Sequence, residues 1–240
     1  ENAPGLRSRR LDPRGRRRHR LLDRGQPDRE SRPASFAGAL GFGGPAVSGG
    51  NVYLLDRDEK VGDTLRVLDL ASGKELWTFA YDAAGSFMFA GSRTTPTVDG
   101  EHVYTVGPMG DLHAINTKTR KPSWRANIWK DFGGAERLPQ WAIVQHPLMY
   151  GDLLIVATQT AEAGVVAYDK LTGTVKWKSA ALSGIPGYVT PSLVKIAGVT
   201  GLEFAINIAP TGKKPELVVK AVRDTPAHVY AGASLLVAAR

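Results

Sequence analysis

The sequence predicts an all-β fold, a β-propeller of four-stranded antiparallel blades, with about three complete blades and part of a fourth. Two motifs carry this prediction. A tryptophan motif recurs three times without gaps, and a proline motif recurs upstream of each copy at intervals of about 50 residues. A β-rich unit of this length is typical of a propeller blade, because one blade cannot bury both of its faces alone.

The proline motif marks the start of each predicted blade. The intervals between successive prolines are 51, 51 and 44 residues. Proline is tolerated at the first position of a strand, because its missing N–H is not needed there. The prolines are Pro45, Pro96, Pro147 and Pro191. The expected blades cover about 43–82, 94–129, 145–180 and, in part, 189–240.

The second copy shows how a complete blade is expected to fold. A short strand follows its proline, and Asp99-Gly100 predicts a tight turn into a second strand over residues 101–106. Residues 112–116 form the expected third strand, and Trp124 lies on the fourth. Four short strands per unit therefore account for the whole repeat.

The fourth copy differs, because no tryptophan motif ends it. Its expected strands cover residues 202–208, 216–222, 228–230 and 235–238. An array that does not close exposes the edges of its terminal sheets. The chain is therefore expected to form an incomplete ring and to be a fragment of a larger propeller.

The tryptophan motif combines a turn with a large apolar side chain. Its copies are Val67–Trp77, Ala114–Trp124 and Ala167–Trp177. An Asp or Asn lies eight positions before each Trp, namely Asp69, Asn116 and Asp169. Such a residue can bond the backbone two residues on and start a turn. The recurring Trp is expected to fill the space between neighbouring sheets, so these six residues are interpreted as structural.

These residues resemble the repeat of the pyrroloquinoline-quinone-like (PQQ-like) propeller family, whose pattern is Ala-x-Asp-x-x-Thr-Gly-x-x-x-Trp. Residues 167–177 match it fully and residues 67–77 closely. Residues 114–124 depart from it, with Asn for Asp and Arg120 for Gly. The resemblance extends over residues 41–200 and implies that each motif Trp docks on the adjacent blade.

The resemblance leaves several functions open. The family includes calcium- and quinone-dependent dehydrogenases, the lipoprotein scaffold that assists outer-membrane protein assembly, and many exported bacterial proteins. It therefore implies a periplasmic or otherwise exported bacterial protein. No secretory signal is present in this chain, because no apolar segment follows the arginines near its start.

The basic charge is concentrated in residues 1–37. Residues 1–33 contain 11 Arg and 5 acidic residues, whereas the rest of the chain contains 20 basic and 18 acidic residues. This Arg-rich segment is expected to be a disordered tail, natural or not, and residues 38–240 form the propeller domain. Nucleic-acid binding through the tail is the weakest functional alternative, because no aromatic residues are interleaved with the arginines.

The sequence contains no recognisable catalytic or metal constellation. Cysteine is absent, and the five His have no zinc-like spacing. A calcium site needs about six to eight oxygen ligands, and no such set can be matched to this chain. No cofactor is therefore predicted; the alternative is a truncated oxidoreductase that uses PQQ with calcium.

A ligand site is expected at the mouth of the central channel. If the repeats are symmetric, the residues three positions before each blade-opening proline lie there, Arg93 and Tyr188 among them. Trp141 and Gln145 lie close by in sequence, and Arg93 suits an anionic ligand or a structural ion pair. The leading prediction is a non-catalytic scaffold for an unknown protein or small molecule. No segment is apolar and long enough to suggest a transmembrane helix.

Overall fold

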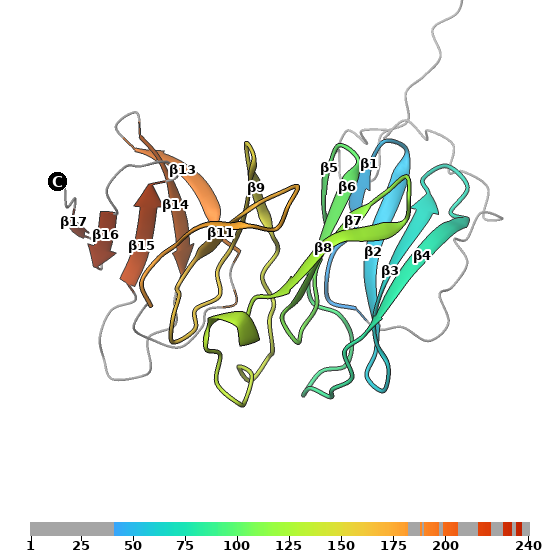
Figure 1. The fold of residues 1–240 in the computed structure, drawn as a ribbon, viewed down its shortest axis with the longest axis horizontal. Coiled ribbons are helices and arrows are strands. Elements are labelled where there is room, and N and C mark those ends of the chain that lie inside the picture. Colours follow the sequence, from blue (N-terminus) through green and yellow to red (C-terminus); the bar gives the residue numbers. More distant parts are fainter. Residues whose placement is uncertain are drawn as a thin grey trace, which may run out of the picture. The chain divides into compact units, whose positions relative to one another are not determined.

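The computed structural model describes residues 41–181, 188 and 190–196, and further strands within 199–236 (Figure 1). The predicted tail, residues 1–37, and the boundary at residue 38 lie outside the described residues. The described part is all-β, as the sequence predicts, with three four-stranded antiparallel sheets and one five-stranded sheet. Its one helical element is a single 3-10 turn, η1 (Lys130–Phe132).

Each sheet is a meander, because strands that follow one another in sequence are also neighbours in the sheet. The first sheet contains β1 (Ala46–Ser48), β2 (Asn51–Asp58), β3 (Gly62–Asp69) and β4 (Glu75–Asp82). The second contains β5 (Thr97–Asp99), β6 (His102–Val106), β7 (Asp111–Asn116) and β8 (Lys121–Asn127). The third contains β9 (Leu148–Tyr150), β10 (Leu153–Val156), β11 (Val166–Asp169) and β12 (Val175–Lys178).

The fourth sheet has one strand more than the other three. Its strands are β13 (Ser192–Ile196), β14 (Val199–Ala205), β15 (Glu216–Ala221), β16 (His228–Ala231) and β17 (Ser234–Leu236). The sequence predicted a partial blade here, and four of these strands overlap the expected ones. The tryptophan motif that ends the other sheets is missing, and two further hairpin strands occupy its place.

The outer two strands of each repeat share one irregularity. In the first three sheets a small or medium side chain on the third strand pairs with the motif Trp on the fourth, and the register shifts directly after this pair. The pairs are Val67 with Trp77, Ala114 with Trp124, and Ala167 with Trp177. A bulge at one repeat position gives each outer strand the same local twist.

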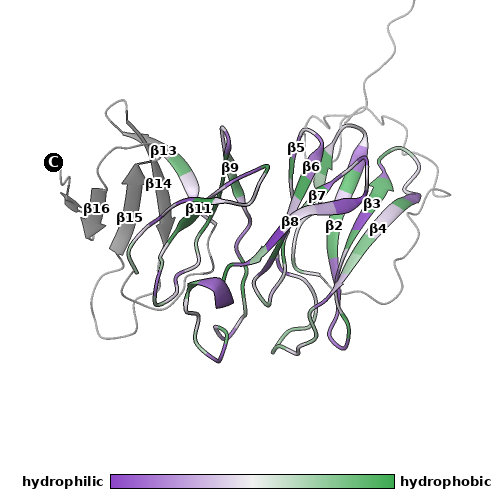
Figure 2. Ribbon diagram, viewed as in Figure 1, coloured by the Kyte–Doolittle hydropathy of each residue, from purple (hydrophilic) through white to green (hydrophobic). Residues whose placement is uncertain are grey.

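Burial follows the order of the sheets. The strands β6 and β7 of the second sheet are almost fully buried, because apolar residues of a neighbouring sheet pack on each face. The outermost strands β4, β8 and β12 alternate between exposed and half-buried residues. Figure 2 shows apolar residues in the interiors of β2 and β3 and hydrophilic residues in η1. The core therefore lies between sheets.

Candidate functional site

The residues directly before the blade-opening prolines join one sheet to the next through equivalent hydrogen bonds. The Gly44 N–H donates to Thr95 Oγ1 at 3.0 Å, the Thr95 N–H to His146 Nδ1 at 2.7 Å, and the His146 N–H to Thr190 Oγ1 at 2.9 Å. A following proline favours an extended backbone at each of these residues, and the same N–H donates to the next copy each time. Because Nδ1 of His146 accepts, the ring proton lies on Nε2, and burial lowers the pKa of this histidine.

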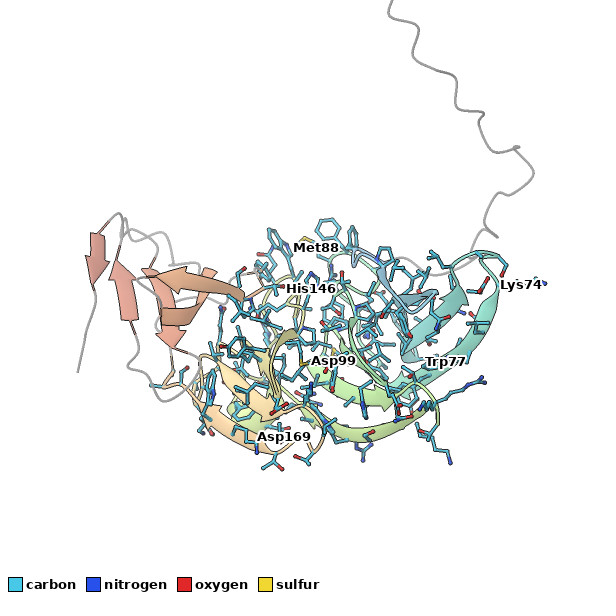
Figure 3. All side chains as sticks on the ribbon, turned by 90° about the horizontal axis from the view of Figure 1, so that it is seen from above. Lys74, Trp77, Met88, Asp99, His146 and Asp169 are labelled. Carbon is cyan, nitrogen blue, oxygen red and sulfur yellow. The ribbon has the colours of Figure 1, made fainter. Side chains whose placement is uncertain are left out.

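This series of bonds fixes the loops that connect the sheets. Figure 3 shows Met88 and His146 on the side of the sheets opposite to Trp77 and Asp169. Met88 belongs to the connection between β4 and β5, and His146 directly precedes the proline that leads into β9. The side with Met88 and His146 is called the loop face here.

Arg93 lies among aromatic rings of the connections between the sheets. Its side chain is almost fully buried, and Nη2 donates to the carbonyl oxygen of Phe89. Its guanidinium lies 5.6 Å from the ring centre of Phe42 and 5.5 Å from that of Phe87. Burial lowers the pKa of Arg93, and no carboxylate within the described residues forms an ion pair with it. Cation–π contacts hold this arginine in place of the ion pair considered from sequence.

The other predicted channel residues form a separate group. The rings of Trp141 and Tyr188 lie 4.7 Å apart, and the Trp141 N–H donates to the Tyr188 hydroxyl at 3.3 Å. Gln145 is buried, so it does not open onto the loop face. The structure thus brings Trp141 and Tyr188 together, whereas the contacts of Arg93 are with Phe42, Phe87 and Phe89.

A cavity of about 420 Å³ lies on the loop face between two connections, β4 to β5 and β8 to β9. Phe87, Met88, Met109 and Leu138 line it, with Arg137 among its polar residues. Large apolar side chains are exposed here and on the adjoining loops: Phe42 (65%), Met88 (63%), Phe89 (49%) and Trp141 (44%). The loop-face patch is defined as these four side chains and the cavity. Sequence reasoning pointed to Trp141 and, as the residue three positions before Pro45, to Phe42. It did not find Met88 and Phe89, because loop composition alone does not reveal exposure.

The motif tryptophans lie at the other side of the sheets, with different surroundings. Trp124 Nε1 donates to the Lys170 carbonyl of the third sheet at 2.9 Å, and its ring stacks on Tyr168 at 5.7 Å. Trp77 packs against the core cluster that contains Val103 of the second sheet. Trp177 packs against residues of its own sheet and makes further contacts.

The turns before these tryptophans use their Asx side chains as acceptors. Asp69 Oδ1 accepts from the Ser72 N–H at 2.7 Å, Asn116 Oδ1 from Thr119 at 2.9 Å, and Asp169 Oδ1 from Thr172 at 3.0 Å. The hydrogen bonds lower the pKa of Asp69, and those from Thr172 and Lys176 lower that of Asp169 to about 2. These side chains hold turns and do not converge on a common point.

A buried ionic cluster between the first and second sheets has no counterpart in the sequence analysis. Arg57 Nη1 lies 3.0 Å from Asp63 Oδ2, and both side chains are fully buried. Arg57 Nη2 also donates to the carbonyls of Ala83 at 2.7 Å and Gly85 at 2.9 Å. Burial raises the pKa of Asp63 to about 6, against the opposing effect of Arg57. The second sheet and the connection that follows β4 bury this pair together, so local sequence carried no signal for it.

Two kinds of site are missing from the part of the chain that the structure describes. No group of three or more His, Asp and Glu residues there could hold a metal ion. His102 pairs with Asn116 and His113 with Thr105, so these two histidines are separated along the ladder. No helix of the described residues is long and apolar enough to cross a membrane.

Comparison with solved structures shows the same fold. The chain is similar to the quinohemoprotein alcohol dehydrogenase of Comamonas testosteroni, with 16% identity and a TM-score of 0.51 over 76% of this chain and 33% of that one. The quinohemoprotein alcohol dehydrogenase ADHIIG of Pseudomonas putida HK5 has 15% identity and a TM-score of 0.50 over 77% of this chain and 34% of that one. BamB of Moraxella catarrhalis has 18% identity and a TM-score of 0.44 over 75% of this chain and 56% of that one. The chain therefore spans about a third of each dehydrogenase and about half of that BamB.

Comparison with protein families gives a match on the repeats themselves. No curated protein matches the chain. The family described as outer membrane protein assembly factor BamB matches residues 61–198, which include all three tryptophan motifs. Because this match covers more than half of the chain and its repeats fold into the sheets described above, the chain belongs to the family of PQQ-like β-propeller repeats.

Proposed function

We propose that this chain is part of a non-catalytic propeller that binds a protein partner at the loop-face patch. The observation that carries the proposal is the exposure of Phe42, Met88, Phe89 and Trp141 around or beside one cavity. Contiguous apolar surface on a folded protein marks interaction sites, and aromatic residues and methionine are enriched in protein interfaces.

Contacts with Arg93 and between the aromatic rings hold part of the patch in place. The Phe42 ring meets the Phe89 ring edge-on at 6.1 Å, and both contact Arg93. The guanidinium therefore holds the Phe42 ring and the backbone of Phe89, and the Phe89 ring is held in turn by its edge-on contact with Phe42. Fixed aromatic side chains lose little conformational entropy on binding, which favours affinity.

The partner is expected to present apolar side chains together with an acidic group. Arg137 lines the cavity, its side chain is exposed, and it forms no ion pair among the described residues. A carboxylate of the partner can pair with it in bidentate geometry. The family description, an outer membrane protein assembly factor, supports a protein as the partner.

The test is selection of peptides from a displayed library on the parent chain, with affinities measured by calorimetry. Selected peptides are expected to bind the Met88→Ser/Phe89→Ser variant at least about tenfold more weakly, since each buried apolar side chain contributes about 1.5–3 kcal/mol. The matched control is Leu76→Ser/Val175→Ser, which removes two exposed apolar side chains from outer strands. Equal affinity for both variants would place binding elsewhere and overturn the proposal.

The oxidoreductase alternative is tested on the same protein. PQQ and Ca²⁺ are added, and bound cofactor and dye reduction with simple alcohols are measured. Stoichiometric cofactor binding with turnover would replace the scaffold function by a quinoprotein function. Binding through the Arg-rich tail lies outside the described residues, and it predicts a steep salt dependence with DNA or RNA.

The family match also supports a location in the periplasm as part of this proposal. Fractionation of bacterial cells that express the full-length gene is expected to release the protein with the periplasmic or outer-membrane fraction. Recovery in the cytoplasmic fraction alone would contradict the proposed location while leaving the binding surface testable in vitro.

A further inference from the structure

A second cavity, of about 460 Å³, lies between the outer strands of the first and second sheets. Its volume is within the range of small-ligand pockets. It is separate from the loop-face patch, because the two share no lining residue. The lining residues with chemical function are Tyr81, Asp82, Asp111, His113, Arg125 and Asp131.

The charge of this cavity is unbalanced. Three carboxylates face one guanidinium, that of Arg125, and none of these carboxylates forms an ion pair within the described part of the chain. Asp111 Oδ1 accepts from Asn127 Nδ2 at 3.0 Å, and Asp131 Oδ2 accepts from the Asn127 N–H at 2.7 Å. Their remaining lone pairs, and both oxygens of Asp82, are available as acceptors.

His113 provides a second and independent observation. It lines the cavity, is only 6% exposed, and its Nδ1 has no hydrogen-bond partner. Burial lowers the pKa of His113 to about 4, so the ring is neutral at pH 7 and adds no positive charge that would repel a cation. The ring lies 4.1 Å from that of Tyr81, and together they form an aromatic wall.

The lining of the cavity suits a guanidinium better than a metal ion. The carboxylates do not form a group that could hold a metal ion, so their charge is spread over the cavity. A guanidinium is planar, carries five N–H donors, pairs with carboxylates in bidentate geometry and stacks on aromatic rings. It therefore matches several separate acceptors and the Tyr81–His113 wall at once.

We propose that the cavity between the first two sheets binds a guanidinium group on an alkyl chain. The group comes either from an arginine side chain of a peptide or from a free guanidino compound. Both sources offer the same chemistry to Asp82, Asp111 and Asp131. The proposal is independent of the loop-face patch and of any partner bound there.

The test follows the histidine Cε1–H resonances of the full chain by NMR during titration. The probes are agmatine, as the free compound, and the peptide Gly-Arg-Gly; the control is Gly-citrulline-Gly, which has the same shape without charge. The His113→Gln variant assigns the resonance. Either charged probe is expected to shift the His113 signal while the citrulline peptide leaves it unchanged. A shift with the peptide alone identifies a polypeptide as the source, and a shift with agmatine alone identifies a free compound.

A matched pair of variants tests the carboxylates. Asp82→Asn removes one cavity charge at an exposed position, and Asp152→Asn removes one from an exposed turn outside the cavity. Asp82→Asn is expected to weaken binding about fivefold, the equivalent of one exposed ion pair, and Asp152→Asn to leave it unchanged. The absence of a His113 shift with both charged probes, or equal affinity of the two variants, would overturn the proposal.

Discussion

The two inter-sheet contacts on either side of the second sheet are built from the same repeat but from different chemistry. Between the second and third sheets, Trp124 stacks on Tyr168 over an apolar cluster that includes Leu112 and Leu154. Between the first and second sheets, the fully buried pair of Arg57 and Asp63 lies next to a polar cavity. Both contacts bury apolar residues, but the contact between the first and second sheets also contains a buried ion pair and a polar cavity.

One residue of the turn accounts for part of this difference. At the equivalent turn position the third sheet has Gly173 and the second sheet has Arg120. A Cβ on Gly173 would lie 2.6 Å from the ring of Trp124, so only glycine lets this Trp approach so closely. Arg120 adopts the same left-handed conformation, with φ 59°, and Trp77 packs against the apolar cluster that contains Val103. The close approach of Trp124 to the turn of the third sheet thus uses both a Trp and a glycine.

The largest expected effect comes from breaking the polar contact. Arg57→Met leaves Asp63 as an unpaired buried charge, and we expect a loss of about 3–5 kcal/mol in the free energy of unfolding. Replacing both, as Arg57→Met/Asp63→Leu, is expected to recover most of this loss, because no buried charge remains. Urea unfolding measures both variants. A single variant within about 1 kcal/mol of the parent would show that water reaches the pair.

The apolar contact is tested at its tryptophan. Trp124→Ala is expected to destabilise by about 3–4 kcal/mol, because it removes the stacking on Tyr168 and one of the two hydrogen bonds to the Lys170 carbonyl, which keeps its bond from the Tyr104 hydroxyl. Trp77→Ala, which removes no such hydrogen bond, is expected to cost about 2 kcal/mol. Thermal and urea unfolding give the difference. If both variants melted alike, the docked indole would carry no special role.

Substitutions at two glycines distinguish the cost of a left-handed backbone from the cost of a collision with Trp124. Gly173→Ala adds a Cβ that collides with Trp124, and we expect a loss of about 2–3 kcal/mol. Gly73 has nearly the same conformation, with φ 68° against 74°, but nothing lies within 4 Å of its Cβ position. Gly73→Ala is therefore expected to cost only about 1 kcal/mol. Equal losses on urea unfolding would assign both effects to φ alone.

The polar contact also predicts opposing effects of pH. Burial lowers the pKa of His113 from 6.5 to about 4, so the folded state binds fewer protons in this window and stability from this group is lost as pH falls from 6.5 to 4. The pKa of Asp63 is raised from 3.8 to about 6, so its contribution has the opposite sign and stability falls as pH rises from 4 to 6.

The two contributions are separated by substitution. In His113→Gln the stability is expected to fall with rising pH between 4 and 6, relative to the parent, by about 1–3 kcal/mol. In Asp63→Asn it is expected to rise relative to the parent over the same window. Urea midpoints at pH 4.5 and 6.5 decide this, and parallel pH profiles for all three proteins would contradict the assignment.

The smallest effect is a gain. Arg120→Gly relieves a non-glycine residue of its left-handed conformation, and we expect a stabilisation of about 0.5–1 kcal/mol. If part of the gain comes from a closer approach of Trp77, that part is expected to disappear in the Trp77→Ala background. A double-mutant cycle by urea unfolding measures this coupling. Additive effects would show that only the backbone conformation matters.

Much of the fold was predictable, because its signals are local. A proline that begins a strand, an Asx residue that caps a turn and a Trp at a fixed spacing each act within a few residues. Their recurrence predicted four strands per repeat, and the first three sheets confirm it. The fourth sheet has five strands and no tryptophan motif. The sequence therefore predicted where its strands lie but not that the sheet has five of them.

The sites were less predictable, because they depend on contacts between repeats. Symmetry placed the residues three positions before each blade-opening proline, Arg93 and Tyr188 among them, at one channel mouth, and Trp141 and Gln145 were added because they lie close by in sequence. The structure pairs Trp141 with Tyr188, buries Gln145 and surrounds Arg93 with Phe42 and Phe87. The hydrogen bonds of Gly44, Thr95 and His146 repeat from copy to copy, but the residues around them differ between connections, so the repeat does not predict their side-chain contacts.

By itself the sequence determined the family, the strands of each repeat and the turns that join them, because each depends on residues close together in the chain. Tertiary structure alone decided that Arg57 and Asp63 are buried, because the next sheet packs closely on them. A Cβ added to Gly107 of that sheet would lie only 2.5 Å from the Asp63 carboxylate. It also decided which loop side chains are exposed and which carboxylates share a cavity with His113. Burial and convergence of charge arise between segments up to about 50 residues apart, and local periodicity carries no information about such distances.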